Sequence, residues 1–239
     1  MNETAAKRVA RTRPVIAIDG PAGAGKSTLA AHLARKFGFL NLETGAMYRA
    51  LALKAIENDL PFDDEAVLMD LAEYTRIALE PQAEGNRVVL DGVDVSRRVR
   101  DTDVTEAASR VSVHPALRAW MVTQQRRLGE QGGVVMEGRD IGTAVFPDAE
   151  VKIFLDAAPE VRGNRRFRQR GPNNESKVTE ESVLRELRER DERDRNRAES
   201  PLKPAEDAVI LDSTAMSLDE VLGAAEAIVR SHVEAAKLH

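Results

Sequence analysis

Residues 19–28 of the chain read DGPAGAGKST, with three glycines between positions 20 and 25. The preceding residues 15–18 (VIAI) form a short apolar run rich in β-branched side chains, which predicts a buried strand. Residues 29–37 place apolar side chains at helical spacing. The stretch therefore joins a strand to a helix, and residues 20–27 fit the pattern G-x-x-x-x-G-K-[ST] in the setting that this motif requires.

This motif predicts a cradle for phosphate groups. Glycines let backbone N–H groups approach an anion, and the first turn of the following helix directs its unpaired N–H groups to the same point. We expect Lys26 to contact the β- and γ-phosphates of ATP or GTP, and the Ser27 hydroxyl to bind Mg²⁺. The flanking strand and helix argue against a chance Gly-rich turn. The residues expected to bind ATP are Gly20, Pro21, Ala22, Gly23, Ala24, Gly25, Lys26, Ser27 and Thr28.

Composition limits the classes of protein to consider. A chain of 239 residues with 42% hydrophobic content can bury a core as one domain, with or without an inserted subdomain. Its net charge of −5 argues against nucleic acid as a partner, and the absence of cysteine excludes disulfides and thiolate sites and suits the cytoplasm. No apolar run approaches the ~20 residues of a membrane helix. We expect a monomer in which residues 1–13 form a mobile tail rather than a nucleic-acid arm.

Strand and helix patterns alternate along the chain. Further apolar strands are predicted at 134–137, 151–156 and 208–212, and helices at 44–57, 63–74, 103–111, 115–131 and from 217 onward. This order predicts an α/β fold with a mainly parallel, doubly wound sheet. Between about 75 and 98, segments 76–80, 87–91 and 93–95 alternate apolar and polar residues around two turn signals, which predicts a small antiparallel insert.

Ligands of such a sheet lie at the carboxyl ends of its strands, so polar residues that follow strands are candidates. Residues 137–140 (EGRD) bring two acids and a guanidinium to one place, although a structural ion pair is the alternative. Residues 44–49 (TGAMYR) carry Arg49 on a helix that can also be simply solvated. Residues 190–197 (RDERDRNR) place Arg190, Asp194 and Arg197 on one face if the helix extends that far, but charge runs are usually solvated faces.

Five arginines crowd into residues 162–170 and are followed by the breaker stretch 171–174 (GPNN). This pattern favours a lid that closes over phosphates. RNA binding is the competing interpretation, and the acidic run that follows and the 4% aromatic content argue against it.

The motifs GPAGAGKST, TGAMYR, EGRDIGTAVFPDA, VKIFLDA and RDERDRNRAESPL resemble those of the bacterial cytidylate kinases, in the nucleoside monophosphate kinase superfamily. The resemblance covers residues 15–222. It implies a kinase domain at 14–239 with about five parallel strands, a monophosphate-binding region at about 44–118 that carries the insert, and a short helical lid at about 160–178. The implied reaction transfers the γ-phosphoryl group of ATP-Mg to CMP or dCMP, a step of pyrimidine nucleotide metabolism.

The resemblance also implies roles for individual residues. Arg49 and Arg139 would bind the phosphate of CMP, and Ser109, Arg118 and Asp140 would read the cytosine. Arg190, Asp194 and Arg197 would hold the ribose and phosphate side, with Thr44 beside them. The residues implied in catalysis are Lys26, Arg139 and the lid arginines Arg162 and Arg166.

The chemistry of phosphoryl transfer agrees with these assignments. A monophosphate has a second pKa of about 6 and needs no general base at pH 7, which fits four histidines that fall in no motif. Asp140 can accept from the N4 amino group of cytosine, whereas uracil would present O4 to it, so we expect preference for CMP over UMP. Two alternatives stay open: a kinase of the same fold for UMP, AMP or shikimate, and a nucleotide-dependent switch.

Overall fold

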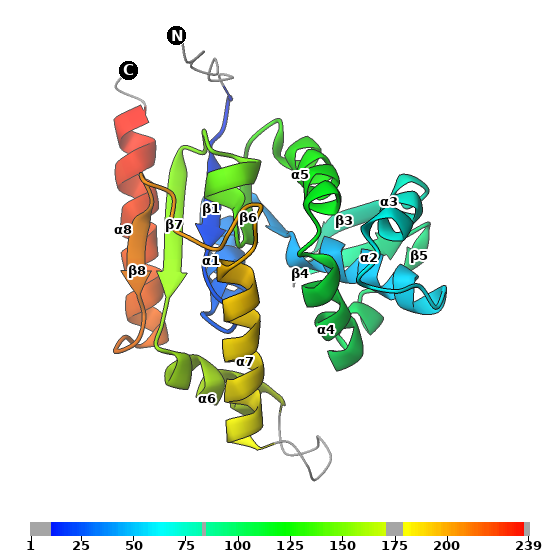
Figure 1. Ribbon diagram of the computed structural model, residues 1–239. Coiled ribbons are helices and arrows are strands. Elements are labelled where there is room, and N and C mark those ends of the chain that lie inside the picture. Colours follow the sequence, from blue (N-terminus) through cyan, green and yellow to red (C-terminus); the bar gives the residue numbers. More distant parts are fainter. Residues whose placement is uncertain (1–10, 83–84, 171–178, 237–239) are drawn as a thin grey trace, which may run out of the picture.

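The central sheet consists of five parallel strands in the order β2-β6-β1-β7-β8. A computed structural model describes residues 11–82, 85–170 and 179–236 of the chain (Figure 1). The strands are β1 (Val15–Asp19), β2 (Leu40–Glu43), β6 (Val134–Gly138), β7 (Val151–Asp156) and β8 (Val209–Asp212). This arrangement confirms the doubly wound α/β fold. Strand β2 was not predicted.

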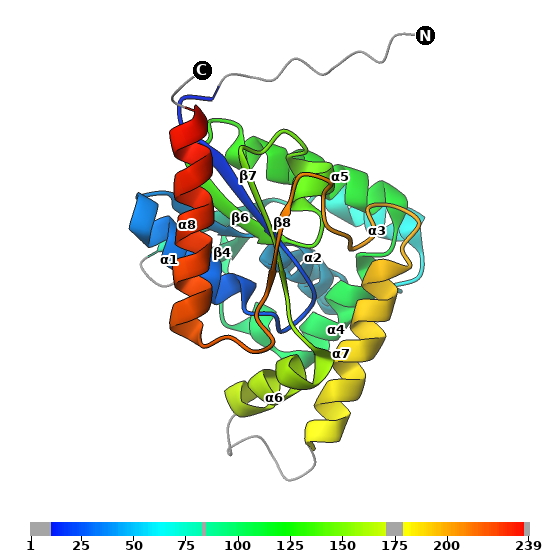
Figure 2. The same ribbon diagram turned by 90° about the vertical axis from the view of Figure 1, so that its left-hand side faces the viewer.

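Helices cover both faces of the sheet because its strands are buried on both sides. Val15 and Ala17 of β1 belong to one core cluster, whereas Ile16 and Ile18 belong to the other. The first cluster packs against α2 (Gly45–Glu57), α4 (Thr102–Val111) and α5 (Pro115–Gly129), and the second against α1 (Lys26–Phe37) and α8 (Leu218–Ala236). Figures 1 and 2 show α8 on the opposite side of the sheet from α2, α4 and α5.

The predicted insert is present as a three-stranded antiparallel sheet. Its strands are β3 (Ile77–Gln82), β4 (Gly85–Leu90) and β5 (Val93–Asp94), preceded by α3 (Glu65–Glu73) and followed by the 3₁₀ turn η1 (Arg98–Arg100). Asn86 ties the insert to the central sheet: its amide group donates to the carbonyl of Asn41 at 2.7 Å and accepts from the N–H of Glu43 at 2.9 Å. The end of β2 is thereby fixed to the insert.

Two helices extend beyond the carboxyl ends of the strands. They are α6 (Pro159–Arg170) and α7 (Glu180–Arg195), which lie side by side in Figures 1 and 2. Thr179 and Ser182 form a capping box at the start of α7, with both side-chain bonds at 3.1 Å. Of the predicted lid, residues 171–178 lie outside the described residues.

Residues 11–13 belong to the predicted mobile tail, and their position differs from that expectation. Arg11 donates to Asp148 at 2.8 Å, and Arg13 donates to the carbonyl of Gly38 at 2.6 Å. These contacts hold the segment against the domain before β1 begins. The remaining tail residues, 1–10, lie outside the described part of the chain.

Candidate active site

The loop between β1 and α1 has the conformation of a phosphate cradle. Gly20 has φ +150°, and a Cβ there would lie 2.0 Å from the carbonyl oxygen of Leu155, so glycine is required. Gly25 caps α1 in the left-handed region at φ 101°. The Lys26 ammonium donates to the carbonyl of Pro21 at 2.8 Å across the loop. The loop therefore folds around the lysine and leaves the N-terminus of α1 open to an anion.

A cavity of about 380 Å³ begins at this loop. Its lining contains eight basic and four acidic side chains, an excess of four positive charges in a chain whose net charge is −5. The volume suits a small ligand and the charge suits phosphates. The cavity brings together thirteen of the predicted site residues: Ala22, Gly23, Lys26, Ser27, Thr44, Arg49, Arg118, Arg139, Asp140, Arg166, Arg190, Asp194 and Arg197.

At one end of the cavity lies a buried ion pair between Arg118 of α5 and Asp140, which follows β6. One guanidinium nitrogen donates to Asp140 Oδ2, and the other donates to the carbonyl of Ser112 at 3.0 Å. The two charged side chains are only 2% and 7% exposed, so a charged acceptor and a fixed cation are both desolvated here. Arg118 also lies over the ring of Tyr48, at 5.5 Å from its centre. This end can recognise a polar planar group.

Asp194 of α7 contacts two of the arginines that line the cavity. Its carboxylate accepts from Arg139 at 3.0 Å and lies 3.5 Å from a guanidinium nitrogen of Arg197. Burial raises the pKa of Asp194, but Arg139, Arg190 and Arg197 outweigh burial and hold it below its usual range. Burial, with Arg139 next in importance, lowers the pKa of Arg190 to about 10. These cations repel one another, so a bound anion would stabilise this arrangement of side chains.

Arg197 reaches the cavity by a route that differs from the sequence argument. Helix α7 ends at Arg195, so Arg197 does not share a helical face with the two residues before it. The carbonyl of Asp194 instead accepts from the N–H of Leu202 at 2.8 Å, and Arg197 donates to the carbonyl of Ser200 at 2.9 Å. The turn after the helix therefore directs this guanidinium back to Asp194.

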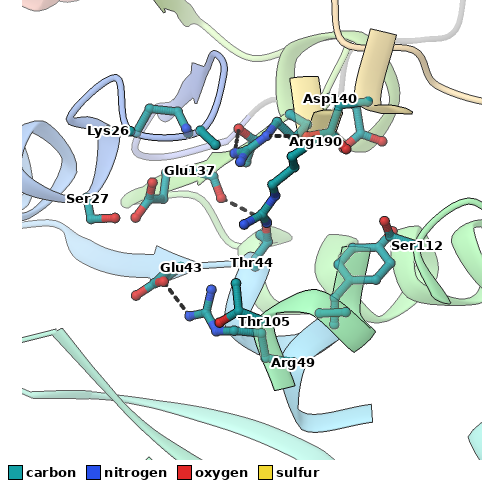
Figure 3. A pocket seen from close by; sticks show the side chains of 18 of the residues that line it. Lys26, Ser27, Glu43, Thr44, Arg49, Thr105, Ser112, Glu137, Asp140 and Arg190 are labelled. Atoms are coloured by element: carbon teal, nitrogen blue, oxygen red, sulfur yellow. Dashed lines mark hydrogen bonds and ion pairs between the residues drawn. The ribbon is translucent and has the colours of Figure 1, made fainter. Parts of the chain in front are cut away.

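Two carboxylates lie at the carboxyl ends of neighbouring strands beside the cradle. Glu43 of β2 and Glu137 of β6 are partners in the strand register. Burial, and then the charge of Glu43, raises the pKa of Glu137, whose Oε1 is buried and has no hydrogen-bond partner among the described residues. Burial, and then Arg139, lowers the pKa of Lys26. Figure 3 shows Lys26, Ser27 and Glu137 near one another.

A second cavity, of about 490 Å³, lies on the other side of the cradle. It shares residues 23 and 26–27 with the first, and its lining includes the apolar side chains of Leu155, Met216 and Leu222. Arg166 of α6 lines both cavities. The cradle and Arg166 therefore stand between two adjoining ligand spaces.

Arg162, the other predicted lid arginine, does not line either cavity. Its guanidinium is buried, donates to the carbonyl of Ala22 at 2.9 Å and pairs with Asp191 of α7 at 2.6 Å. Asp191 in turn accepts from the N–H of Ala22 at 3.2 Å. In this structure Arg162 and Asp191 thus hold the backbone of the cradle at Ala22, and the contact of Arg162 with the transferred phosphoryl group stays a prediction.

Ser109, predicted to read the base, is buried in α4 but is not among the cavity residues. Its hydroxyl has no hydrogen-bond partner among the described residues. The side chains of α4 and its C-terminus that line the cavity are Thr105, Ala108 and Ser112. The structure therefore places its neighbours, rather than Ser109 itself, at the cavity wall.

Sequence reasoning missed Asp19, Glu43 and Arg100, which all contribute to the site. Asp19 ends β1, and its carboxylate accepts from the N–H groups of Ile141 at 2.8 Å and Gly142 at 2.7 Å, which ties the cradle to the segment after Asp140. Burial raises the pKa of Asp19 to about 6. Arg100, at the end of the insert, lines the cavity. The signal for Asp19 was its place at a strand end, whereas nothing in the local sequence distinguishes Arg100 from its neighbours.

The profile of the cytidylate kinase family matches residues 16–231. A cytidylate kinase of Aeromonas hydrophila is 51% identical over 87% of this chain and 90% of its own, and one of Solibacter usitatus is 47% identical over 98% and 97%. A gluconokinase structure from Sinorhizobium meliloti is similar in fold, with a TM-score of 0.51 and 15% identity, over 96% of this chain and 98% of its own.

The described helices include none that is long and apolar enough to cross a membrane. A phosphate cradle that opens into a cationic cavity is the arrangement that a kinase needs, and the family profile spans most of the sequence. The chain belongs to the cytidylate kinase family and is a kinase.

Proposed function

We propose that this kinase transfers the γ-phosphoryl group of ATP to CMP or dCMP. The observation that carries the proposal is one cavity lined by the phosphate cradle, the Arg118–Asp140 pair and further cations; Figure 3 shows Lys26 and Asp140 on opposite sides of it. The cradle suits the donor's phosphates, and the cations suit the acceptor's phosphate. The names of the relatives point to the same acceptor.

Mg²⁺ fits the residues beside the cradle. A hard cation takes oxygen ligands, and here the Ser27 hydroxyl and the unpartnered buried Oε1 of Glu137 are both at the cavity wall. Ser27, with Glu137 nearby, would hold the ion together with the donor's phosphates. Bound there, Mg²⁺ would neutralise the charge that develops on the phosphates.

The protein's own groups then bring two anions together. Lys26 and Arg166 lie where the two cavities meet and would stabilise the transferred group, while Arg139 and Arg190 would hold the acceptor phosphate. The acceptor oxygen is already anionic near pH 7, so a general base is not needed. Catalysis therefore rests on alignment and charge neutralisation.

Base selection rests on the buried pair at the far end. Asp140 Oδ2 accepts from Arg118, so Oδ1 would accept from the N4 amino group of cytosine. Uracil would set its O4 against this carboxylate, and a buried acceptor–acceptor contact costs about 1–3 kcal/mol or more. CMP and dCMP are therefore favoured over UMP.

The test is ADP release from ATP-Mg with CMP, dCMP, UMP, AMP and GMP as separate acceptors. Lys26→Ala should lower turnover by about 10²- to 10³-fold. Lys36→Ala, on the same helix but paired at the surface with Glu226, serves as the matched control. Turnover with CMP and dCMP that is lost only in Lys26→Ala supports the proposal. Turnover with another acceptor refutes the base assignment, and nucleotide binding without acceptor-dependent turnover points to a switch.

A further inference from the structure

The guanidinium group of Arg49 already pairs with a carboxylate of the protein itself, that of Glu43. A guanidinium nitrogen of Arg49 lies 2.5 Å from Oε1 of Glu43, and both residues line the cavity. Figure 3 shows this pair at the cavity wall, below Glu137. The two side chains are 16% and 24% exposed, so solvent screens the pair only in part. Any phosphate that is to reach Arg49 must therefore compete with this carboxylate.

The carboxylate of Glu43 is held in its charged form. Burial raises its pKa, but Arg49 first and then Arg100 and Lys26 lower it further, so the pKa lies below its usual range. Glu43 therefore presents a negative charge to the cations of the cavity near neutral pH. An acceptor phosphate bound to Arg49 would lie among the same cations that now surround Glu43.

The strand that carries Glu43 is fixed, whereas its side chain has a second cation within reach. The backbone N–H of Glu43 donates to Asn86 of the insert at 2.9 Å, which anchors the main chain. Arg100 lines the same cavity, and its charge already acts on Glu43, because it is one of the cations that lower the pKa of that carboxyl. The carboxylate can thus leave Arg49 by side-chain rotation and meet Arg100 without moving β2.

We propose that Glu43 is a specificity-determining residue that substitutes for the acceptor phosphate in the empty enzyme and is displaced from Arg49 when a phosphate dianion binds. This inference rests on the proposed function, since it concerns the acceptor side of that site. Until exchange, Glu43 keeps the Arg49 side chain in place. A ligand with less charge than a phosphate dianion gains too little from Arg49 to displace it, so the exchange favours monophosphates over nucleosides.

The consequence is that removing the charge of Glu43 strengthens phosphate binding. In Glu43→Gln, the phosphate no longer competes with a carboxylate for Arg49 and no longer faces its repulsion. We expect CMP and inorganic phosphate to bind about 3- to 10-fold more tightly in calorimetric titrations without Mg²⁺ and ATP. Cytidine, which lacks the phosphate, should bind with unchanged affinity.

Glu80→Gln is the matched control. It removes one carboxylate from the insert, where Glu80 pairs with Arg87 at 3.0 Å on the surface, and so it makes the same change in net charge outside the cavity. Its affinities for phosphate and CMP should equal those of the unmodified protein. If Glu43 only orients Arg49, then Glu43→Gln will bind phosphate more weakly. Weaker or unchanged binding of phosphate overturns the proposal.

Two further measures keep the test decisive. Should Glu43→Gln fail to show a cooperative thermal transition, Glu43→Asp replaces it: its shorter side chain draws the carboxylate away from Arg49, and about 2- to 3-fold tighter phosphate binding is expected. Unchanged or weaker binding by that variant overturns the proposal equally. Failure of the proposed function would be visible separately, as unmodified protein that does not phosphorylate CMP, while the phosphate titration still decides the role of Glu43.

Discussion

Replacing Asp140 by Asn should reduce the discrimination between CMP and UMP. In the structure the carboxylate accepts from Arg118 through Oδ2, and both side chains are almost fully buried. Asn is nearly the same size and can turn its oxygen toward Arg118. Its amide NH₂ then faces the base, where it opposes the N4 amino group of cytosine and can donate to O4 of uracil.

The magnitude follows from the hydrogen bonds exchanged. A hydrogen bond to a charged group contributes about 1.5–3 kcal/mol, so kcat/KM for CMP should fall by about 10- to 150-fold. UMP gains a donor in place of a repulsive acceptor, and its kcat/KM should rise or stay constant. The preference for CMP should therefore shrink by at least about tenfold. Stability should fall as well, because the buried Arg118 keeps only a neutral partner.

The assay compares kcat/KM for CMP and UMP in the unmodified protein and in Asp140→Asn, with urea unfolding to follow stability. Asp207→Asn is the matched control, because Asp207 also pairs with a buried cation, Lys152 at 2.7 Å, but lies outside the cavity. Equal losses for both acceptors, with the CMP-to-UMP ratio unchanged, would refute the assignment of Asp140 to base recognition.

Two other outcomes follow from the geometry of the cradle. Gly20→Ala should lower the free energy of unfolding by about 3 kcal/mol or more, because its Cβ would lie 2.0 Å from the carbonyl oxygen of Leu155; urea unfolding of native-like stability would contradict the strain. For Asp19, whose pKa rises from 3.8 to about 6, the folded state keeps a proton that the unfolded state releases between these values, so stability is lost as the pH rises from about 4 to 6. Between pH 4.5 and 7 this loss is about 2 kcal/mol, and Asp19→Asn should remove it. Urea unfolding of the unmodified protein and of Asp19→Asn at pH 4.5 and 7 checks this. If the free energies of unfolding of the two proteins differ by the same amount at both pH values, Asp19 is not the source of the loss.

Strand and helix periodicity predicted most of the fold because most elements are long or strongly apolar. One exception is β2, which has four residues and alternates Leu with Asn and Glu; Leu40 at its start is 52% exposed. A short edge strand of this kind lacks the continuous apolar run of the buried strands. Missing β2 also meant missing Glu43, whose importance comes from its position at the end of that strand.

The different positions of the two lid arginines could not be predicted from the sequence. Arg162 and Arg166 are four residues apart on α6, so local spacing gives them the same face. The structure separates them because Asp191 of α7 pairs with Arg162 under the cradle, whereas Arg166 lies between the two cavities. Which arginine meets which acid depends on helix packing across 29 residues of chain.

The cationic character of the cavity could be inferred only from clustering, since the chain as a whole is acidic. Seven of the eight basic residues that line it are arginines, and the single lysine is Lys26. Burial and Arg139 lower the pKa of both Lys26 and Arg190, but that of Arg190 stays at about 10. An arginine thus stays positively charged near pH 7 in a crowded buried site where a lysine loses part of its charge. A phosphate bound in the cradle would raise the pKa of Lys26, so the ammonium group takes up a proton from the solvent as the donor binds.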